Sequence, residues 1–184
     1  MFRKYLFFLF ISFLSSIHAY GDQKEDIIKK IIDLETLEFT FKQKINDEVE
    51  EGSCLLKFPG KLKCNYFDNK QKELLINNRK LAITQKRYDK TYFFPVSKSP
   101  LLNILYKKKL IDIIKTGDLK KSNQYLQLIY NMESKIIILF DRNNFELSGW
   151  EIIDQYNNKT DFKLKIIARN SIFPNNTFEL PLIN

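Results

Sequence analysis

Residues Gly52–Tyr66 read GSCLLKFPGKLKCNY, and this stretch is the most informative part of the chain. It predicts two short strands around a tight turn at Phe58-Pro59-Gly60, because proline and glycine interrupt the chain there and apolar residues alternate on both sides. Pairing across the turn then sets like residues opposite one another: Lys57 with Lys61, Leu56 with Leu62, and Cys54 with Cys64. One apolar face and one mostly polar face are typical of an antiparallel sheet that covers an apolar interior.

The first nineteen residues have the features of a secretory signal peptide. Arg3 and Lys4 give a positive start, and an apolar and serine run over residues 5–17 is too short to span a bilayer. Ile17-His18-Ala19 offers small or aliphatic residues at the cleavage positions, so we expect cleavage after Ala19. Residues 20–184 are then enough for one domain with its own core. An uncleaved anchor is the alternative.

The composition lacks most of the groups that enzymes use. The one histidine, His18, lies in the segment expected to be removed, which leaves no imidazole for nucleophilic catalysis or for a metal site. The sequence has two cysteines and no CxxC, P-loop or GxGxxG motif. We therefore expect no enzymatic activity, no cofactor and no metal. A hydrolase that uses carboxylates such as Asp141 and Asp154 is the enzymatic alternative.

The chain is basic, with a formal net charge of +8. This charge indicates either an acidic partner or an anionic membrane surface, or else only a lysine-rich composition. No nucleic-acid motif is present, and export argues against a nucleic-acid partner.

Alternating or short apolar runs between turn residues predict about eleven strands. They cover residues 37–45, 52–57, 61–66, 73–76, 80–85, 91–94, 111–115, 124–130, 135–140, 146–154 and 161–167. No long helical pattern interrupts the C-terminal runs, which favours a meander over a parallel sheet.

Two helices are expected in addition to these strands. Asp22 and Glu25 form a capping box before an amphipathic helix of about 13 residues. Ser99-Pro100 opens a second helix, with Leu101, Leu102 and Leu105 on its apolar face. Core packing would explain these leucines as well as a role in covering a cavity.

The order of several short motifs resembles the LolA family, the periplasmic carriers of lipoproteins in Gram-negative bacteria. The hairpin fits at Gly52, Leu56, Lys57, Pro59 and Leu62. Phe58 stands where the family usually has arginine, and Cys64 where it usually has tryptophan. The closing pattern fits at Leu147-Ser148-Gly149-Trp150, Asp154, Thr160 and the segment 172–181, which contains Phe178. The match runs from the first helix to the end of the chain.

The resemblance implies a mainly β fold with a helical lid (α+β). This is a strongly curved, incompletely closed antiparallel β-barrel of about eleven strands covered by α-helices. It also implies a monomeric periplasmic carrier that binds acylated lipoproteins in a hydrophobic cavity. The carrier takes them from an ABC-type transporter of the inner membrane to the outer membrane or a receptor there. The expected cavity lining is Cys54, Leu56, Leu62, Cys64, Leu101, Leu102 and Leu105.

Two local features remain open at this stage. Cys54 and Cys64 form a cross-strand disulfide in the oxidising periplasm, or they are two free thiols that fill space. Phe58 occupies the position of the family's lid latch, and it offers no hydrogen-bond donor where arginine offers five. We expect Phe58 to close the mouth through apolar contact with Leu101 or Leu105, with Lys57 or Lys61 as alternative donors.

Other binding functions fit the same pattern. The protein could be a related carrier or sensor of another envelope lipid, because an apolar lining does not distinguish lipids. Besides the carriers and the hydrolase, a third class is a structural β-protein of the envelope. Such a protein would have a stable partner and no bound lipid.

Overall fold

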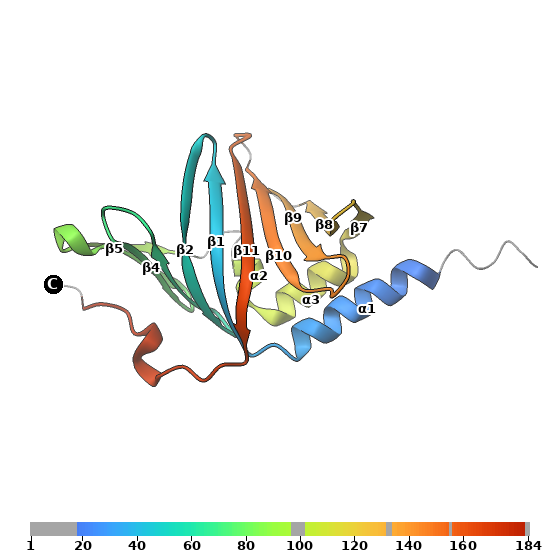
Figure 1. Cartoon of the computed structure of the whole chain (residues 1–184), viewed down its shortest axis with the longest axis horizontal. Helices are drawn as coiled ribbons and strands as arrows, with labels where there is room; N and C mark the ends of the chain where they lie inside the picture. Colours follow the sequence, from blue (N-terminus) through green and yellow to red (C-terminus); the bar gives the residue numbers. More distant parts are fainter. Residues whose placement is uncertain (1–17, 97–101, 132–133, 155, 183–184) are drawn as a thin grey trace, which may run out of the picture.

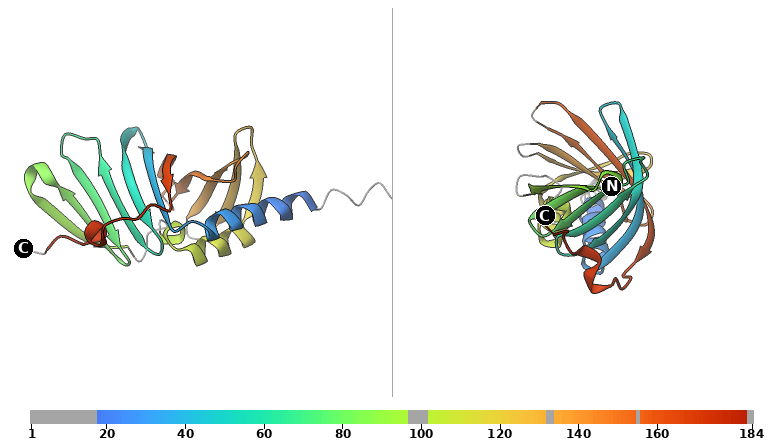
Figure 2. Two further views of the ribbon diagram at one scale, coloured as in Figure 1. Left: turned by 60° about the horizontal axis from the view of Figure 1, so that its bottom comes forward. Right: turned by 90° about the vertical axis from the view of Figure 1, so that its left-hand side faces the viewer.

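The dominant feature of the structure is one eleven-stranded antiparallel sheet. The computed structural model describes residues 18–96, 102–131, 134–154 and 156–182. The sheet curves strongly, and its edge strands β6 and β7 are not paired with each other (Figures 1 and 2). The strands are β1 (Thr36–Ile45), β2 (Glu48–Lys57), β3 (Lys61–Tyr66), β4 (Lys72–Asn77), β5 (Lys80–Gln85), β6 (Lys90–Pro95), β7 (Asp118–Lys121), β8 (Tyr125–Asn131), β9 (Lys135–Asp141), β10 (Leu147–Ile153) and β11 (Lys159–Arg169). The predicted fold class is confirmed.

The sheet consists of two meanders. Strands β1 to β6 follow one another in space, as do β7 to β11, and β1 pairs with β11 to join the two halves. This pair places Phe39 opposite Ile166 and Phe41 opposite Leu164. In the β2–β3 hairpin, the observed register is the one that the sequence predicts, with Leu56 opposite Leu62. The meander expected for the C-terminal half is therefore confirmed, and the N-terminal half has the same arrangement.

The helices lie against one half of the sheet. They are α1 (His18–Ile32), α2 (Leu102–Leu105) and α3 (Lys107–Thr116), and there are two short 3-10 helices, η1 (Lys86–Tyr88) and η2 (Asn175–Phe178). Figures 1 and 2 show α1 and α3 side by side beneath the β7–β11 half. Their buried isoleucines and leucines share one core with alternate residues of β8 and β9, including Leu128 and Ile138.

Two lysines connect α1 and α3, each donating from one helix to the C-terminal end of the other. Lys24 of α1 donates to the carbonyl oxygens of Lys115 and Gly117, at the end of α3, over 3.0 and 2.7 Å. Lys107, the first residue of α3, donates to the carbonyl of Ile32, the last residue of α1, over 3.0 Å. Each lysine thus satisfies carbonyls that a helix end leaves free, and its charge complements the helix dipole.

Two predictions need correction: one strand and the start of the first helix. The run 111–115 is not a strand, because it lies inside α3, where Leu110, Ile113 and Ile114 are buried at helical spacing. The seventh strand is β7 instead, so the predicted number of strands was right although one of its members was wrong. The first helix begins at His18, so Asp22 lies within it rather than at its cap. Ser99 and Pro100 lie outside the described residues.

A stack of aromatic rings crosses the concave face where the two halves meet. Phe162 of β11 stacks on Trp150 with ring centroids 4.1 Å apart, and on Phe41 of β1 with centroids 5.0 Å apart. Phe41 also meets Tyr66 of β3 edge-on at 5.1 Å. Phe41 reaches Tyr66 over Gly52, its partner in β2, since a Cβ at Gly52 would lie 2.6 Å from the Phe41 ring. The glycine is therefore required by close packing.

The C-terminal segment covers part of the convex face. It runs beneath the β1–β6 half in Figure 1 and carries η2. Asn77 donates from its side chain to the carbonyl of Phe178 over 3.0 Å, and Phe178 is buried. Leu75 and Ala82, which pair across β4 and β5, are also buried and point away from the concave face. The segment thus provides the second layer for this part of the sheet.

Substitution of Gly52 by alanine should destabilise the protein by about 2–4 kcal/mol, because the new methyl group would overlap the Phe41 ring and the Asn65 carbonyl oxygen, 2.3 Å away. Chemical denaturation followed by circular dichroism measures this free energy. Ser53→Ala, at the neighbouring half-buried position, is the control and should change stability by less than about 1 kcal/mol. Equal stability of the two variants would contradict the packing role of Gly52.

Candidate functional site: the concave face

The concave face of the β1–β6 half carries two continuous rows of apolar side chains. The strand registers set each member opposite the next. One row is Phe39, Cys54, Cys64, Leu74, Ile83 and Tyr92, and the other is Leu37, Leu56, Leu62, Ile76, Leu81 and Phe94. Both rows cross the sheet from β1 to its edge at β6. They form an apolar wall about as wide as six strands.

Exposure rises along both rows towards the edge of the sheet. Cys54 and Leu56 are buried, Leu74, Leu81 and Ile83 are half-buried, and on β6 Tyr92 and Phe94 reach 46% and 47% exposure. This rise in exposure reflects the position of the helices: α1 and α3 lie under the other half of the sheet and do not cover β5 and β6 (Figure 2). The wall is therefore a packed core at one end and an open apolar surface at the other.

The structure brings most of the expected lining residues together. Cys54, Leu56, Leu62, Cys64 and Leu105 are all buried in one core cluster, together with Ile104 of α2. Leu102 lies in α2, but its side chain is outside the described residues, as is the whole of Leu101. That these residues line a ligand cavity stays a prediction, because in this arrangement they contact one another.

Sequence reasoning placed Leu74, Leu81 and Ile83 in strands but missed them as candidate lining. The pairing registers would have identified them, because each residue lies in the same row as Leu62 or Cys64 and at most two strands away. The turns that set those registers were recognised, but their geometry was not.

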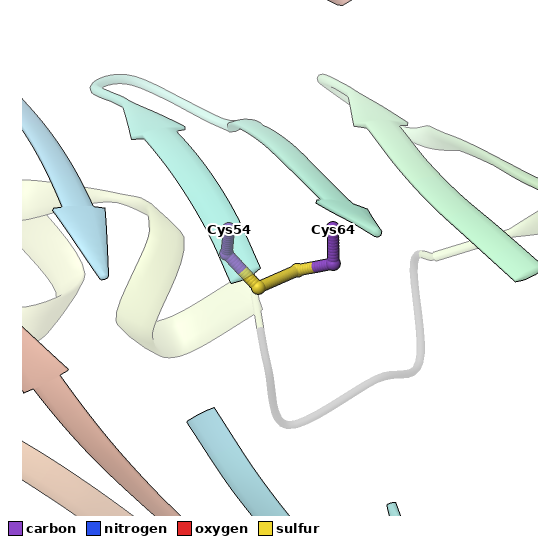
Figure 3. Close-up of a disulfide and its surroundings, with 2 residues drawn as sticks. All are labelled: Cys54 and Cys64. Carbon is purple, nitrogen blue, oxygen red and sulfur yellow. A yellow bond between two sulfur atoms is a disulfide. The ribbon is translucent and has the colours of Figure 1, made fainter. Parts of the chain in front are cut away.

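A disulfide joins the second and third positions of one row. Cys54 and Cys64 face each other across β2 and β3 with their Cα atoms 4.1 Å apart, and their sulfur atoms are bonded (Figure 3). Both residues are buried. The bond locks the register of this hairpin, since a slip by one residue would turn its apolar side chains to the other face.

The turn at Phe58 is held by the backbone rather than by an arginine. The Phe58 amide donates to the Glu35 carbonyl over 3.0 Å, and the Gly60 amide donates to the Leu105 carbonyl over 2.9 Å. Gly60 has φ of +70°, and a Cβ there would lie 2.7 Å from the Tyr106 hydroxyl. The hairpin and the end of α2 are thus in direct contact. The bond joins a strand turn to the segment expected to act as the lid.

Lys107 supplies the positive charge at this junction. Its ammonium donates to Glu35 Oε1 over 2.7 Å, in addition to its bond to Ile32, and lies 5.7 Å from the centre of the Phe58 ring. Phe58 is buried in the same core cluster as Leu105. Glu35, Phe58 and Lys107 also border a cleft of about 200 Å³. No local sequence pattern predicts this pairing, because Lys107 lies far from the hairpin along the chain.

Tyr66 closes the aromatic stack beside a small charged group. Burial raises the pKa of the Tyr66 phenol to about 12, and the carboxylates of Glu50 and Asp68 add to the effect. Lys72 lies 3.8 Å from the centre of the ring and is paired with Glu50. The phenol is thus held neutral at the end of the apolar stack.

The two carboxylates considered for hydrolysis are not a pair. Asp141 accepts from the amides of Asn143 and Asn144 in the turn after β9. Asp154, at the opposite end of β10, accepts from Asn158 and Tyr156, and the hydrogen bonds from Asn158 are the main reason that its pKa is lowered. Both cap their own turns.

Neither a metal site nor a membrane-spanning helix emerges from the described residues. Within those ranges no three His, Cys, Asp or Glu side chains gather as metal ligands would. No helix there combines the length and the apolar character needed to cross a bilayer.

The comparisons with known proteins identify the family. The model of the family described as "Outer membrane lipoprotein carrier protein LolA" matches residues 33–181. The chain belongs to the LolA family. The match includes all eleven strands, α2 and α3, and it begins at the end of α1. A comparison with curated protein sequences found no match.

Solved structures share the fold at low sequence identity. A Vibrio parahaemolyticus domain described as an outer membrane lipoprotein-sorting protein is 8% identical, with a TM-score of 0.50 over 87% of this chain and 97% of that chain. A DUF1329 family protein from Desulfovibrio piger is 6% identical, with a TM-score of 0.50 over the same shares. The Pseudomonas aeruginosa MucA/MucB complex gives 10% identity and 0.50, covering 88% of this chain and 61% of that chain. These similarities show the LolA-like fold alone.

Replacement of Lys107 by methionine should loosen the junction between the hairpin and the helices. The variant keeps most of the apolar stem but loses the bonds to Ile32 and Glu35. Because Glu35 is exposed, we expect a loss of only about 1 kcal/mol, which corresponds to about fivefold faster hydrogen exchange at the amides of Phe58 and Gly60. Lys108→Met, one residue further along, is the matched control. Unchanged exchange in the Lys107 variant would show that this lysine does not hold the junction.

Tyr66 should be among the last tyrosines to ionise when the pH is raised. Its folded pKa of about 12 lies above the ordinary value of 10, so the neutral phenol contributes stability below pH 10. That contribution, roughly 2–3 kcal/mol, is lost as the pH rises from 10 to 12. Ultraviolet titration and denaturation at each pH measure both effects. Tyr66→Phe should lack this part of the alkaline destabilisation, and an equal pH dependence in both proteins would refute the assignment.

Proposed function

We propose that the protein is a periplasmic carrier that binds the acyl chains of lipoproteins on its concave face. It would take them from an ABC-type transporter of the inner membrane to the outer membrane or a receptor there. Family membership supports the class of function. The observation that carries the proposal is the pair of apolar rows, which run unbroken from the core to the open edge of the sheet.

The rows meet the physical demand that such a cargo makes. Each buried CH₂ group contributes about 0.8 kcal/mol, so an acyl chain cannot cross water without an apolar partner. Leu74, Leu81 and Ile83 are half-buried and offer a surface for the first contact. Deeper entry would require α2 to move away from Leu56 and Leu62, because these side chains share one core with Leu105.

The N-terminus and the cysteines support a proposal for the route of the protein. We propose that residues 1–19 are a signal peptide cleaved after Ala19, which would leave most of α1 in the mature domain of residues 20–184. Oxidation of Cys54 and Cys64 supports an oxidising compartment such as the periplasm. The mature protein would act as a monomer.

The proposed activity involves no bond chemistry and no cofactor. It is supported by the local roles of Asp141 and Asp154, each of which caps a turn instead of facing an apolar cleft. Transfer would depend only on the difference in free energy between the bound chain, the transporter and the acceptor.

A carboxylate at Ile83 should weaken cargo binding while leaving the fold intact. Ile83 is half-buried on the concave face, where water can reach a carboxylate in the free protein but an acyl chain would displace that water. We expect the affinity for a fluorescent triacylated lipopeptide to fall by about 10- to 100-fold in Ile83→Glu. Fluorescence titration measures the affinity, and circular dichroism checks the fold.

Ile167→Glu is the matched control, because Ile167 lies in β11 and is exposed. Its affinity should equal that of the wild type. If neither variant changes binding, or if the wild-type protein binds no lipopeptide, the concave face is not an acyl site. Mass spectrometry of lipids that co-purify from the periplasm would show whether the natural cargo is an acylated protein or a free lipid.

A further inference from the structure

The edge of the sheet at β5, η1 and β6 exposes four aromatic rings within seven residues. Tyr88 is 53% exposed, Tyr92 46%, Phe93 37% and Phe94 47%. Tyr92 and Phe94 lie on the concave face, opposite Ile83 and Leu81, whereas Phe93 lies on the convex face opposite Ala82. We call residues 79–95 the β6 edge. Each of these rings therefore keeps more than a third of its surface exposed, and those of β6 lie on both faces of the edge strand.

Cations stand at both ends of this aromatic run. Arg79 and Lys80 lie at one end, beside Pro95, and Lys86, Arg87 and Lys90 lie at the other. All five are exposed, and Asp89 is the only acid in the segment. Among the described residues, Lys86 pairs with Glu73 and Arg87 donates to the Asn69 carbonyl. The side chains of Arg79, Lys80 and Lys90 have no such partner there.

Several lysines of the central convex face are paired with acids: Lys42 with Glu51, Lys159 with Glu151, and Lys163 with Asp161. At the β6 edge only Lys86 has such an acidic partner among the described residues, so most of the positive charge there is not neutralised. Figure 1 shows that this edge lies at the end of the molecule opposite α1. It is accessible to a large flat partner.

We propose that the β6 edge docks the protein on an anionic lipid bilayer. Tyrosine rings prefer the interface between headgroups and acyl chains, phenylalanine rings enter the acyl boundary just below it, and exposed lysines and arginines bind anionic headgroups. In this arrangement the rings of Tyr92, Phe93 and Phe94 enter the interface, and the two cationic ends contact headgroups on either side. The proposal concerns the empty protein and does not depend on the cargo.

The alternative occupant is a polypeptide strand added to β6, because no strand of the described residues pairs with the outer side of β6. Strand addition uses the backbone of the edge and side-chain pockets on alternate positions. Pro95 lacks an amide donor, and the charges at both ends disfavour an added strand unless it is acidic. The rings on both faces and the surplus of cations therefore favour the bilayer.

Docking would also orient the concave face. The two apolar rows end at Tyr92 and Phe94, so their open end would face the lipid surface. An acyl chain could then pass between the bilayer and the wall without crossing bulk water. This consequence rests on the proposed function, whereas docking itself does not.

The test is sedimentation of the mature protein, without cargo, with large vesicles. One set contains phosphatidylcholine alone and the other contains about one-third phosphatidylglycerol. We expect binding to the anionic vesicles to be at least about tenfold tighter and to weaken at high salt, because exposed charges are screened. Tyr92→Ser/Phe94→Ser and Lys80→Glu/Lys90→Glu should each reduce this binding by about tenfold or more.

Matched controls carry the same changes elsewhere. Phe67→Ser removes a ring that is 69% exposed outside the β6 edge, and Lys29→Glu/Lys108→Glu reverses two charges on α1 and α3. Neither should change binding, and melting curves should show that all variants fold. Equal binding to both kinds of vesicle, or equal losses in the controls, would overturn the proposal.

Absence of vesicle binding by the wild-type protein would also overturn it and leave the β6 edge to a polypeptide partner. Leu74→Glu separates the two proposals, because Leu74 is half-buried in the same apolar row but lies in β4, outside the β6 edge. This variant should bind anionic vesicles as the wild type does, even though its affinity for the lipopeptide should fall. Vesicle binding that persists without any lipopeptide binding would refute the carrier function and retain the docking surface.

Discussion

The pairing of β1 with β11 is the constraint on which the rest of the structure depends. It joins two meanders that are far apart in the sequence, and it brings Phe41 and Phe162 into a stack with Trp150. Each such ring pair contributes about 0.5–1.5 kcal/mol beyond the burial of its area. The stack requires glycine at two neighbouring positions, because a side chain at either position would overlap its surroundings. A Cβ at Gly149 would lie 2.1 Å from the Phe162 carbonyl oxygen, and one at Gly52 would overlap Phe41.

The two halves of the sheet that the β1–β11 pair connects have different structural roles. The β7–β11 half holds α1 and α3, whose opposed lysine contacts at Lys24 and Lys107 make the helix pair one unit. The β1–β6 half carries the apolar rows, and its outer strands are only partly covered on the concave side. A ligand can therefore meet exposed apolar surface at β5 and β6 without disturbing the helices, and only a deeper position requires displacement of α2.

The sequence predicts local pairing well and distant pairing poorly. The β2–β3 register followed from the alternation around Pro59 and Gly60, because one turn fixes it. Residues 111–115 were misassigned because the run Ile-Asp-Ile-Ile-Lys has apolar residues at both strand and helix spacing. The outer members of the rows, such as Ile83, depend on three successive registers. The bond between Gly60 and Leu105 joins segments whose approach no local pattern reports.

The resemblance to the family predicts an arginine at the position of Phe58, and the structure shows what joins the hairpin to the helices without one. An arginine would bring its donors from the turn to the helices. Here the donors are the Gly60 amide on one side and the Lys107 ammonium on the other, and Phe58 fills the space between them as an apolar side chain. A backbone bond to Leu105 breaks whenever α2 moves, so closure and the position of α2 are coupled directly. Lys107 instead binds the end of α1 from the start of α3, so it can hold that helix pair while α2 departs. An opening that admits cargo would then break two contacts of Leu105. One is the hydrogen bond from Gly60, which contributes about 0.5–1.5 kcal/mol, and the other is the apolar contact of the Leu105 side chain. On the proposed function, acyl chains would replace that apolar contact, so opening would cost little free energy only when cargo is present.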